Sequence, residues 1–147
     1  MAGKASVGRL LACIVIVSLF SAQSIANDAG SGGDAGSTQG TATALPAANS
    51  TYYGNLTSGS DTSDYYSFNI PNSTALSLEL TSPSSADFDP YIYDSSGSQI
   101  DYSYTTNQVE SATTNGTSVG GTTVYVEVDW YSGSGQYSLQ IWIFPDA

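Results

Sequence analysis

Apolar and polar side chains alternate in short runs along most of this sequence, and this pattern constrains the fold more than any other feature. Successive side chains of a strand point to opposite faces, so each run gives one strand a core-facing side. Residues such as Gly, Ser, Asn, Asp and Pro bound each run, and no run has helical periodicity. The clearest runs are 64–70, 75–80, 87–94, 124–130 and 136–143, and weaker ones lie near 52–56, 99–104 and 108–113.

Runs of this kind predict a fold made only of strands. About eight short strands separated by turns, each with one apolar face, are typical of two antiparallel sheets packed face to face. We therefore predict an all-β fold over residues 49–147, an antiparallel β-sandwich of jelly-roll type.

The first 26 residues have the pattern of an export signal. Lys4 and Arg9 form a short basic start, an apolar run extends from Leu10 to Phe20, and small residues precede Asn27. The apolar run is shorter than the roughly 20 residues that a membrane span needs. We expect a secreted or cell-surface protein without a transmembrane segment in its mature chain.

Residues 27–48 are rich in Gly, Ser, Thr, Ala and Asp and contain few larger apolar side chains. Such a composition buries too little apolar surface to offset the entropy of ordering. The segment is predicted to be a flexible linker between the export signal and the folded domain.

The charge distribution is one-sided. Both basic residues and the one cysteine precede residue 27, whereas all 13 acidic residues follow it, and the sequence has no histidine. The mature chain therefore has no side-chain salt bridges or disulfides, and nucleic acid and anionic membranes should repel it.

Four segments carry a family resemblance: GNL at 54–56, DTSDYYSF at 61–68, ADFDPYIYD at 86–94 and GSGQYSL at 133–139. In this order they resemble the bacterial and archaeal pre-peptidase C-terminal domain, over residues 51–143. The resemblance implies a jelly-roll-like sandwich that accompanies exported enzymes without being catalytic. It also implies binding of calcium and of a polymeric ligand, because related collagen-binding domains bind calcium. Pro90 departs from the pattern and predicts an edge or bulged strand, because proline cannot donate to the ladder.

Catalysis is not expected. Without His, Cys or Lys, the mature chain has no usual pair of nucleophile and base. The nearest carboxylate pairs, Asp87 with Asp89 and Glu127 with Asp129, have i, i+2 spacing, which on a strand puts both side chains on the outward face rather than in a cleft.

Calcium is the better use for clustered carboxylates, because a hard divalent ion relieves their mutual repulsion. The candidate ligands are Asp61, Asp64, Asp87 and Asp89. The alternative is that these side chains cap turns and solvate an exposed face.

Eleven tyrosines add an aromatic surface. Outward faces or loops are predicted for Tyr65, Tyr91, Tyr93, Tyr125 and Tyr131. Such rings could stack on sugars or peptides, or could simply reflect the preference of tyrosine for strands.

Four Asn-x-Ser/Thr sequences predict acceptor sites for N-glycans at Asn49, Asn55, Asn72 and Asn115.

These features favour a non-catalytic binding or accessory module that recognises a glycan, a matrix polymer or a partner protein, with calcium as a stabilising ion. Two alternatives stay open. One is a structural subunit of a surface layer or filament, built through exposed strand edges. The other is a domain that aids export or maturation of a separate secreted hydrolase.

Overall fold

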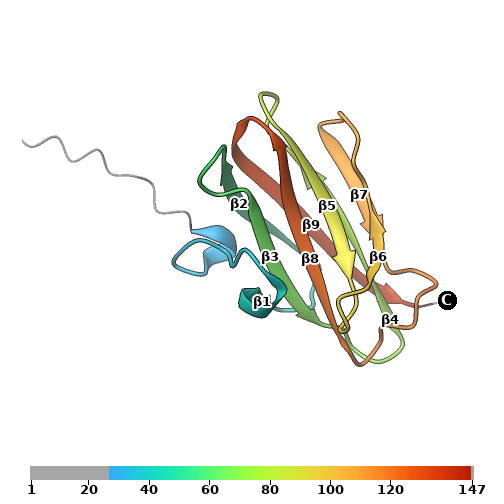
Figure 1. Ribbon diagram of the computed structural model, residues 1–147. Helices are drawn as coiled ribbons and strands as arrows, with labels where there is room; N and C mark the ends of the chain where they lie inside the picture. Colours follow the sequence, from blue (N-terminus) through green and yellow to red (C-terminus); the bar gives the residue numbers. More distant parts are fainter. Residues whose placement is uncertain (1–26, 147) are drawn as a thin grey trace, which may run out of the picture.

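The computed structural model describes residues 27–146, which form a sandwich of two β-sheets (Figure 1). One sheet has the strand order β1-β3-β8-β5-β6 and the other β2-β9-β4-β7. The strands are β1 Thr43–Leu45, β2 Ser50–Thr57, β3 Ser63–Asn69, β4 Thr74–Thr81, β5 Asp87–Tyr93, β6 Gln99–Tyr102, β7 Val109–Thr113, β8 Thr123–Ser132 and β9 Ser134–Pro145. The predicted export signal, residues 1–26, lies outside the described residues.

The predicted β-sandwich is confirmed, and each predicted run corresponds to one of the strands β2 to β9. All strand pairings are antiparallel except that of the unpredicted strand β1 with β3, which is parallel. The two helices of residues 27–146 are 3-10 turns, η1 Asp28–Gly30 and η2 Gln39–Thr41, and neither is long enough to cross a membrane.

The core lies between the sheets and is built from the inward residue of each alternating pair. On β3 and β8, the inward side chains of Phe68 and Val126 are fully buried. From the facing sheet, Leu78 of β4 and Leu139 of β9 are equally buried. The polar residues between them lie on the outer faces, as the period of a strand requires.

The chain changes sheets at Gly133, between β8 and β9. Gly133 has a φ of 78°, which disfavours any side chain, and an added Cβ would lie 2.3 Å from the Ser85 carbonyl oxygen. The Trp130 indole N–H donates to the Gly133 carbonyl oxygen (2.6 Å) and fixes this corner.

Pro90 lies inside β5, which is not an edge strand because β8 and β6 flank it. The register is interrupted between Asp87 and Phe88 on the β8 side, and between Ile92 and Tyr93 on the β6 side. The Pro90 carbonyl oxygen accepts from the Ser103 N–H, just past the end of β6. The strand is therefore bulged, as predicted, but it is not at the edge.

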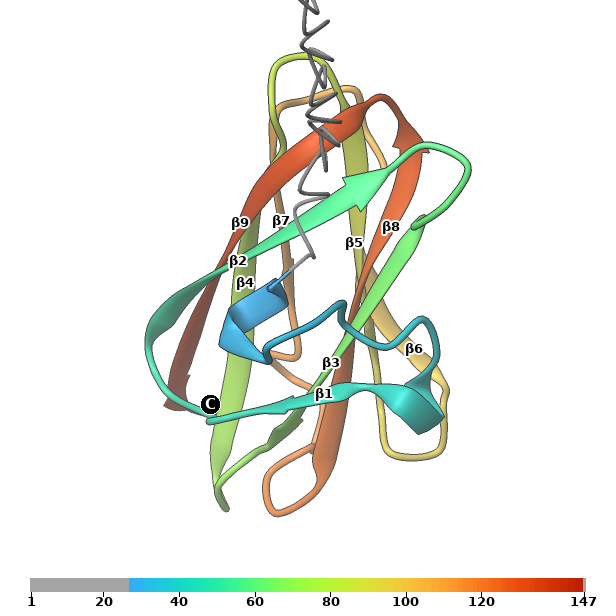
Figure 2. The same ribbon diagram turned by 90° about the vertical axis from the view of Figure 1, so that its left-hand side faces the viewer.

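Residues 27–48 pack against the sandwich, so the prediction of a flexible linker is wrong. Figure 2 shows the segment crossing the side of the molecule in front of β2 and β3. The Tyr65 N–H donates to the Gly36 carbonyl oxygen (2.7 Å), and Ala35 joins the core with 2 % of its surface exposed. The composition of residues 27–48 does not reveal this packing, because backbone hydrogen bonds to unpaired strand edges, rather than large apolar side chains, order the segment.

Candidate functional site

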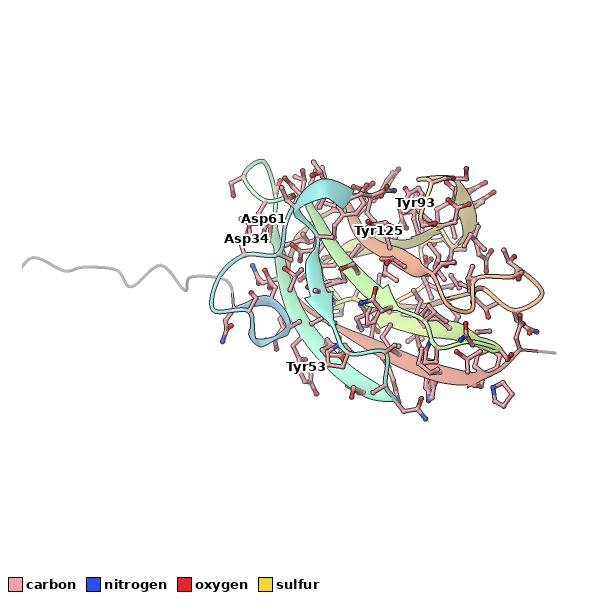
Figure 3. The ribbon with its side chains drawn as sticks, turned by 90° about the horizontal axis from the view of Figure 1, so that it is seen from below. Asp34, Tyr53, Asp61, Tyr93 and Tyr125 are labelled. Carbon is pink, nitrogen blue, oxygen red and sulfur yellow. The ribbon has the colours of Figure 1, made fainter. Side chains whose placement is uncertain are left out.

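Four carboxylates meet where residues 27–48 cover the side of the sandwich between β2 and β3. One oxygen each from Asp28, Asp34 and Asp64 lies within 4.8 Å of the other two. The fourth carboxyl group, that of Asp61, lies close to Asp34, and Figure 3 shows these two side chains next to each other. We call this group, Asp28, Asp34, Asp61 and Asp64, the aspartate cluster.

Asp28 joins the N-terminal segment to the edge of β2. Its Oδ1 accepts a hydrogen bond from the Asn55 N–H (2.8 Å), and its Oδ2 accepts one from the Ala35 N–H (3.1 Å). The side chain is buried, with 1 % of its surface exposed. Asp34 is exposed, so the cluster reaches from the interior to solvent.

Asp64 points into the sandwich. It is fully buried on β3, on the same face as Tyr66, because the two residues are separated by one strand period. The Tyr137 hydroxyl donates to Asp64 Oδ2 (2.6 Å) and accepts from the Tyr66 hydroxyl (2.6 Å). The other oxygen, Asp64 Oδ1, is buried without a hydrogen-bond partner, so one coordination position of a buried carboxylate is left free.

Gly54 makes room for this chain of hydroxyls. It lies opposite Tyr137 in the pairing of β2 with β9. A Cβ added at Gly54 would lie 2.2 Å from the Tyr137 hydroxyl oxygen. The missing side chain therefore lets the tyrosine ring cross β2 and reach Asp64.

The surroundings of the aspartate cluster disfavour negative charge on its buried carboxyl groups. Burial, followed by the charges of the neighbouring aspartates, raises the pKa of Asp64 to about 8 and that of Asp61 to about 7. Burial also raises the pKa of Asp28. Residues 27–147 contain no Lys, Arg or His that could compensate these charges.

The donor set fits a hard divalent cation. Carboxylate oxygens are the ligands that calcium prefers, and calcium tolerates irregular geometry with 6 to 8 oxygens. The free Asp64 Oδ1 offers a ligand atom that no protein group uses. A bound cation would favour the ionised forms of Asp28, Asp61 and Asp64, whose pKa values are raised by burial and by the neighbouring charges.

The structure brings together two of the four predicted calcium ligands. Asp61 and Asp64 belong to the aspartate cluster, whereas Asp87 and Asp89 lie at a separate cavity. Asp89 is opposite Asp129 of β8, on the outer face of the five-stranded sheet, while Asp64 is on its inner face. The sequence therefore does not define one four-residue site.

Asp28 and Asp34 were missed because they lie in the segment that was predicted to be a linker. Their signal in the sequence is a repeat of Asp-Ala-Gly at 28–30 and 34–36. The contact of this repeat with β2 and β3 comes from tertiary packing and leaves no local pattern.

The predicted outward tyrosines lie largely on the outer face of the five-stranded sheet. Five rings from β3, β5, β6 and the following loop form a near-parallel stack in the order Tyr65, Tyr93, Tyr91, Tyr102 and Tyr104, with neighbouring centroids 5.0–6.4 Å apart. We call this row the tyrosine stack. Tyr102 and Tyr104 are exposed at 42 % and 63 %, so this end of the stack is open to solvent.

Glu127 is tied to this outer face by hydrogen bonds. Its Oε2 accepts from the Tyr93 hydroxyl (2.7 Å), and its Oε1 accepts from the Ser63 hydroxyl (2.9 Å). Tyr93 and Tyr125, which Figure 3 labels, are opposite each other on β5 and β8. Glu127 thus organises the surface and is not a free general base.

No family model matches the sequence, and no curated protein matches it. Among solved structures, the chain is similar to the crystal structure of the pre-peptidase C-terminal domain of a collagenase from Bacillus anthracis. The TM-score is 0.57 at 19 % sequence identity, over 68 % of this chain and 93 % of that domain. The part of the chain that the structure describes therefore has the same β-sandwich fold as that domain.

Proposed function

We propose that this chain is a non-catalytic binding or accessory module of a secreted or surface-displayed protein, and that calcium bound at the aspartate cluster stabilises it. The observation that carries the calcium proposal is the buried carboxylate of Asp64, which has one oxygen without a hydrogen-bond partner and lies in a group with Asp28 and Asp34 whose ligand atoms are within 4.8 Å of one another.

Calcium would act by fastening the N-terminal segment. Asp28 and Asp34 come from that segment, whereas Asp61 and Asp64 come from the β2–β3 turn and from β3. An ion held by all four would connect the segment to both sheets, since Asp28 also accepts from the β2 backbone. The ion would thus provide the electrostatic attraction that salt bridges provide in chains with basic side chains.

The non-catalytic part of the proposal rests on chemistry. The mature chain lacks His, Cys and Lys, and the Tyr93 and Ser63 hydroxyls already occupy Glu127. The fold, shared with an accessory domain of a collagenase, supports the same conclusion. Secretion is proposed from the export pattern of residues 1–26.

Thermal unfolding of residues 27–147 in chelator and in calcium tests the proposal. Calcium at about 100 times its Kd should add about 2.7 kcal/mol of stability and raise the Tm by about 10 °C. Magnesium at the same ionic strength should give a much smaller rise, because it prefers fewer protein ligands and strict octahedral geometry.

The Asp64→Asn variant provides the specific control. An amide oxygen can still accept from Tyr137, so the calcium-free fold should persist, but the calcium-dependent rise in Tm should disappear. Glu79→Gln on β4 removes one charge away from the cluster and should keep the full rise. Equal responses of the wild type and the Asp64→Asn variant would refute calcium binding at this cluster.

A further inference from the structure

A second acidic cavity lies at the outer face of the five-stranded sheet. It has a volume of about 450 Å³. Its walls are carboxylates and tyrosine rings from β5, the end of β8 and the loop between β6 and β7: Asp87, Asp89, Tyr91, Tyr104, Thr105 and Tyr131. Tyr104 and Tyr131 are strongly exposed, at 63 % and 68 % of their surface.

Two carboxylates, Asp87 and Asp89, line this cavity, and they have few hydrogen-bond partners. Asp89 is 94 % buried, and no group of residues 27–146 donates a hydrogen bond to its side chain. Glu110 is not part of the cavity wall, but it is hydrogen-bonded to the lining residue Thr105: its Oε1 accepts from the Thr105 N–H (2.6 Å), whereas its buried Oε2 has no partner. Asp87 Oδ1 is buried and unpartnered as well.

Electrostatics point in the same direction. Burial and the charges of Glu110, Asp87 and Asp129 raise the pKa of Asp89 to about 7. The mature chain has no basic side chain that could fill the cavity. The walls therefore favour a ligand that brings positive charge together with several hydrogen-bond donors.

A metal ion suits this cavity less well than an organic cation. In the part of the chain that the structure describes, three carboxylate ligand atoms within 4.8 Å of one another occur at Asp28, Asp34 and Asp64, and Asp87, Asp89 and Glu110 form no such group. The space between the carboxylates is instead bounded by three tyrosine rings. Aromatic faces attract organic cations, arginine most often.

A guanidinium group matches these walls. It is planar, carries five N–H donors, pairs with carboxylates through two parallel hydrogen bonds and stacks on aromatic rings. Tyr104 ends the tyrosine stack, with Tyr102 parallel to it at 5.0 Å, so one ring of the cavity is already fixed in orientation.

We propose that this cavity binds the guanidinium group of an arginine side chain on a partner polypeptide. A second copy of residues 27–147 cannot supply it, because that sequence contains no arginine. β6, beside the cavity, is the last strand of its sheet, so an extended segment of the partner can pair along its edge. The proposal rests on the role as a binding module but does not depend on calcium.

The test is a titration of the protein with the peptide acetyl-Gly-Arg-Gly-amide, followed by NMR shifts of the protein. The matched peptide with citrulline has the same shape without the charge. We expect the arginine peptide to bind at least tenfold more tightly than the citrulline peptide and to shift the signals of Tyr104 and Asp89. Asp89→Asn should weaken binding at least tenfold with an unchanged or higher Tm, whereas Glu79→Gln should not change it.

Several results would overturn the proposal. They are no binding of the arginine peptide, equal binding of the two peptides, and equal affinity of the wild type and the Asp89→Asn variant. Tighter binding of agmatine than of the peptide would assign the cavity to a small cation instead. Another such result is equal displacement of the peptide by calcium from the wild type and from the Asp64→Asn variant. That result would assign the cavity to calcium, whose candidate ligands predicted from the sequence include Asp87 and Asp89.

The calcium response of the same samples separates this proposal from that of the aspartate cluster. If the arginine peptide binds but calcium leaves the Tm unchanged, the calcium proposal fails and the cavity proposal stands. If calcium raises the Tm through Asp64 but the peptide does not bind, the cavity proposal fails and the calcium proposal stands.

Discussion

Gly54 shows how one absent side chain determines the candidate site. Its position opposite Tyr137 lets the phenol pass over β2. The hydroxyl then orients the buried carboxylate of Asp64 and leaves Oδ1 of that residue free. Asp64 thus depends on a residue that carries no functional group.

Gly54→Ala should therefore disturb the site and not only the strand. The new methyl group would overlap the Tyr137 hydroxyl, and overpacking of this kind costs about 1–3 kcal/mol. Chemical denaturation should show this loss, together with a weaker calcium response. Gly40→Ala, where the nearest atom to the new Cβ is 3.9 Å away, should leave both properties unchanged, and equal behaviour of the two variants would contradict the role of Gly54.

Strands β2 to β9 were predictable because each carries its own alternating pattern. The position of Asp64 on the inner face also follows from period two, since it precedes Tyr66 by two residues. By contrast, β1 and the ordering of residues 27–48 depend on backbone hydrogen bonds to strands distant in the sequence, such as that of Tyr65 with Gly36. Such contacts leave no trace in composition, so half of the aspartate cluster was not predicted.

The N-terminal segment should be the element most sensitive to calcium. The N–H groups of Asn55 and Tyr65 are protected by acceptors in this segment. Without calcium, local detachment should let both exchange with deuterium much faster than the Leu76 N–H, which donates to Thr114 on the far side of the sandwich (2.8 Å).

With calcium, the protection of Asn55 and Tyr65 should approach that of Leu76. Amide exchange followed by NMR gives the three rates in one experiment. If calcium does not change the protection of Asn55 and Tyr65 relative to that of Leu76, the ion does not fasten the segment.

At the scale of the whole molecule, the buried carboxylates should make calcium-free stability fall as pH rises. The pKa values of Asp61, Asp64 and Asp89 are raised to about 7, 8 and 7 in the folded state. Folding thus favours their protonated forms; this stabilisation is complete below their ordinary pKa of 3.8 and is lost as pH rises through 7 to 8.

The Tm in chelator should accordingly decrease from pH 5 to pH 8, and the rise caused by calcium should grow over the same range, because the ion binds the ionised carboxylates. Asp64→Asn should flatten the decrease in chelator. A Tm in chelator that is constant or increases with pH would contradict the protonation of the buried aspartates.

The most direct measurement is a crystal structure of residues 27–147 grown in calcium, with anomalous scattering used to locate the ion. The account predicts one calcium ion bonded to Asp64 Oδ1 and to carboxylate oxygens of Asp28, Asp34 and Asp61, at 2.3–2.6 Å. An ion at Asp87 and Asp89 instead, or no ion at the aspartate cluster at saturating calcium, would contradict it.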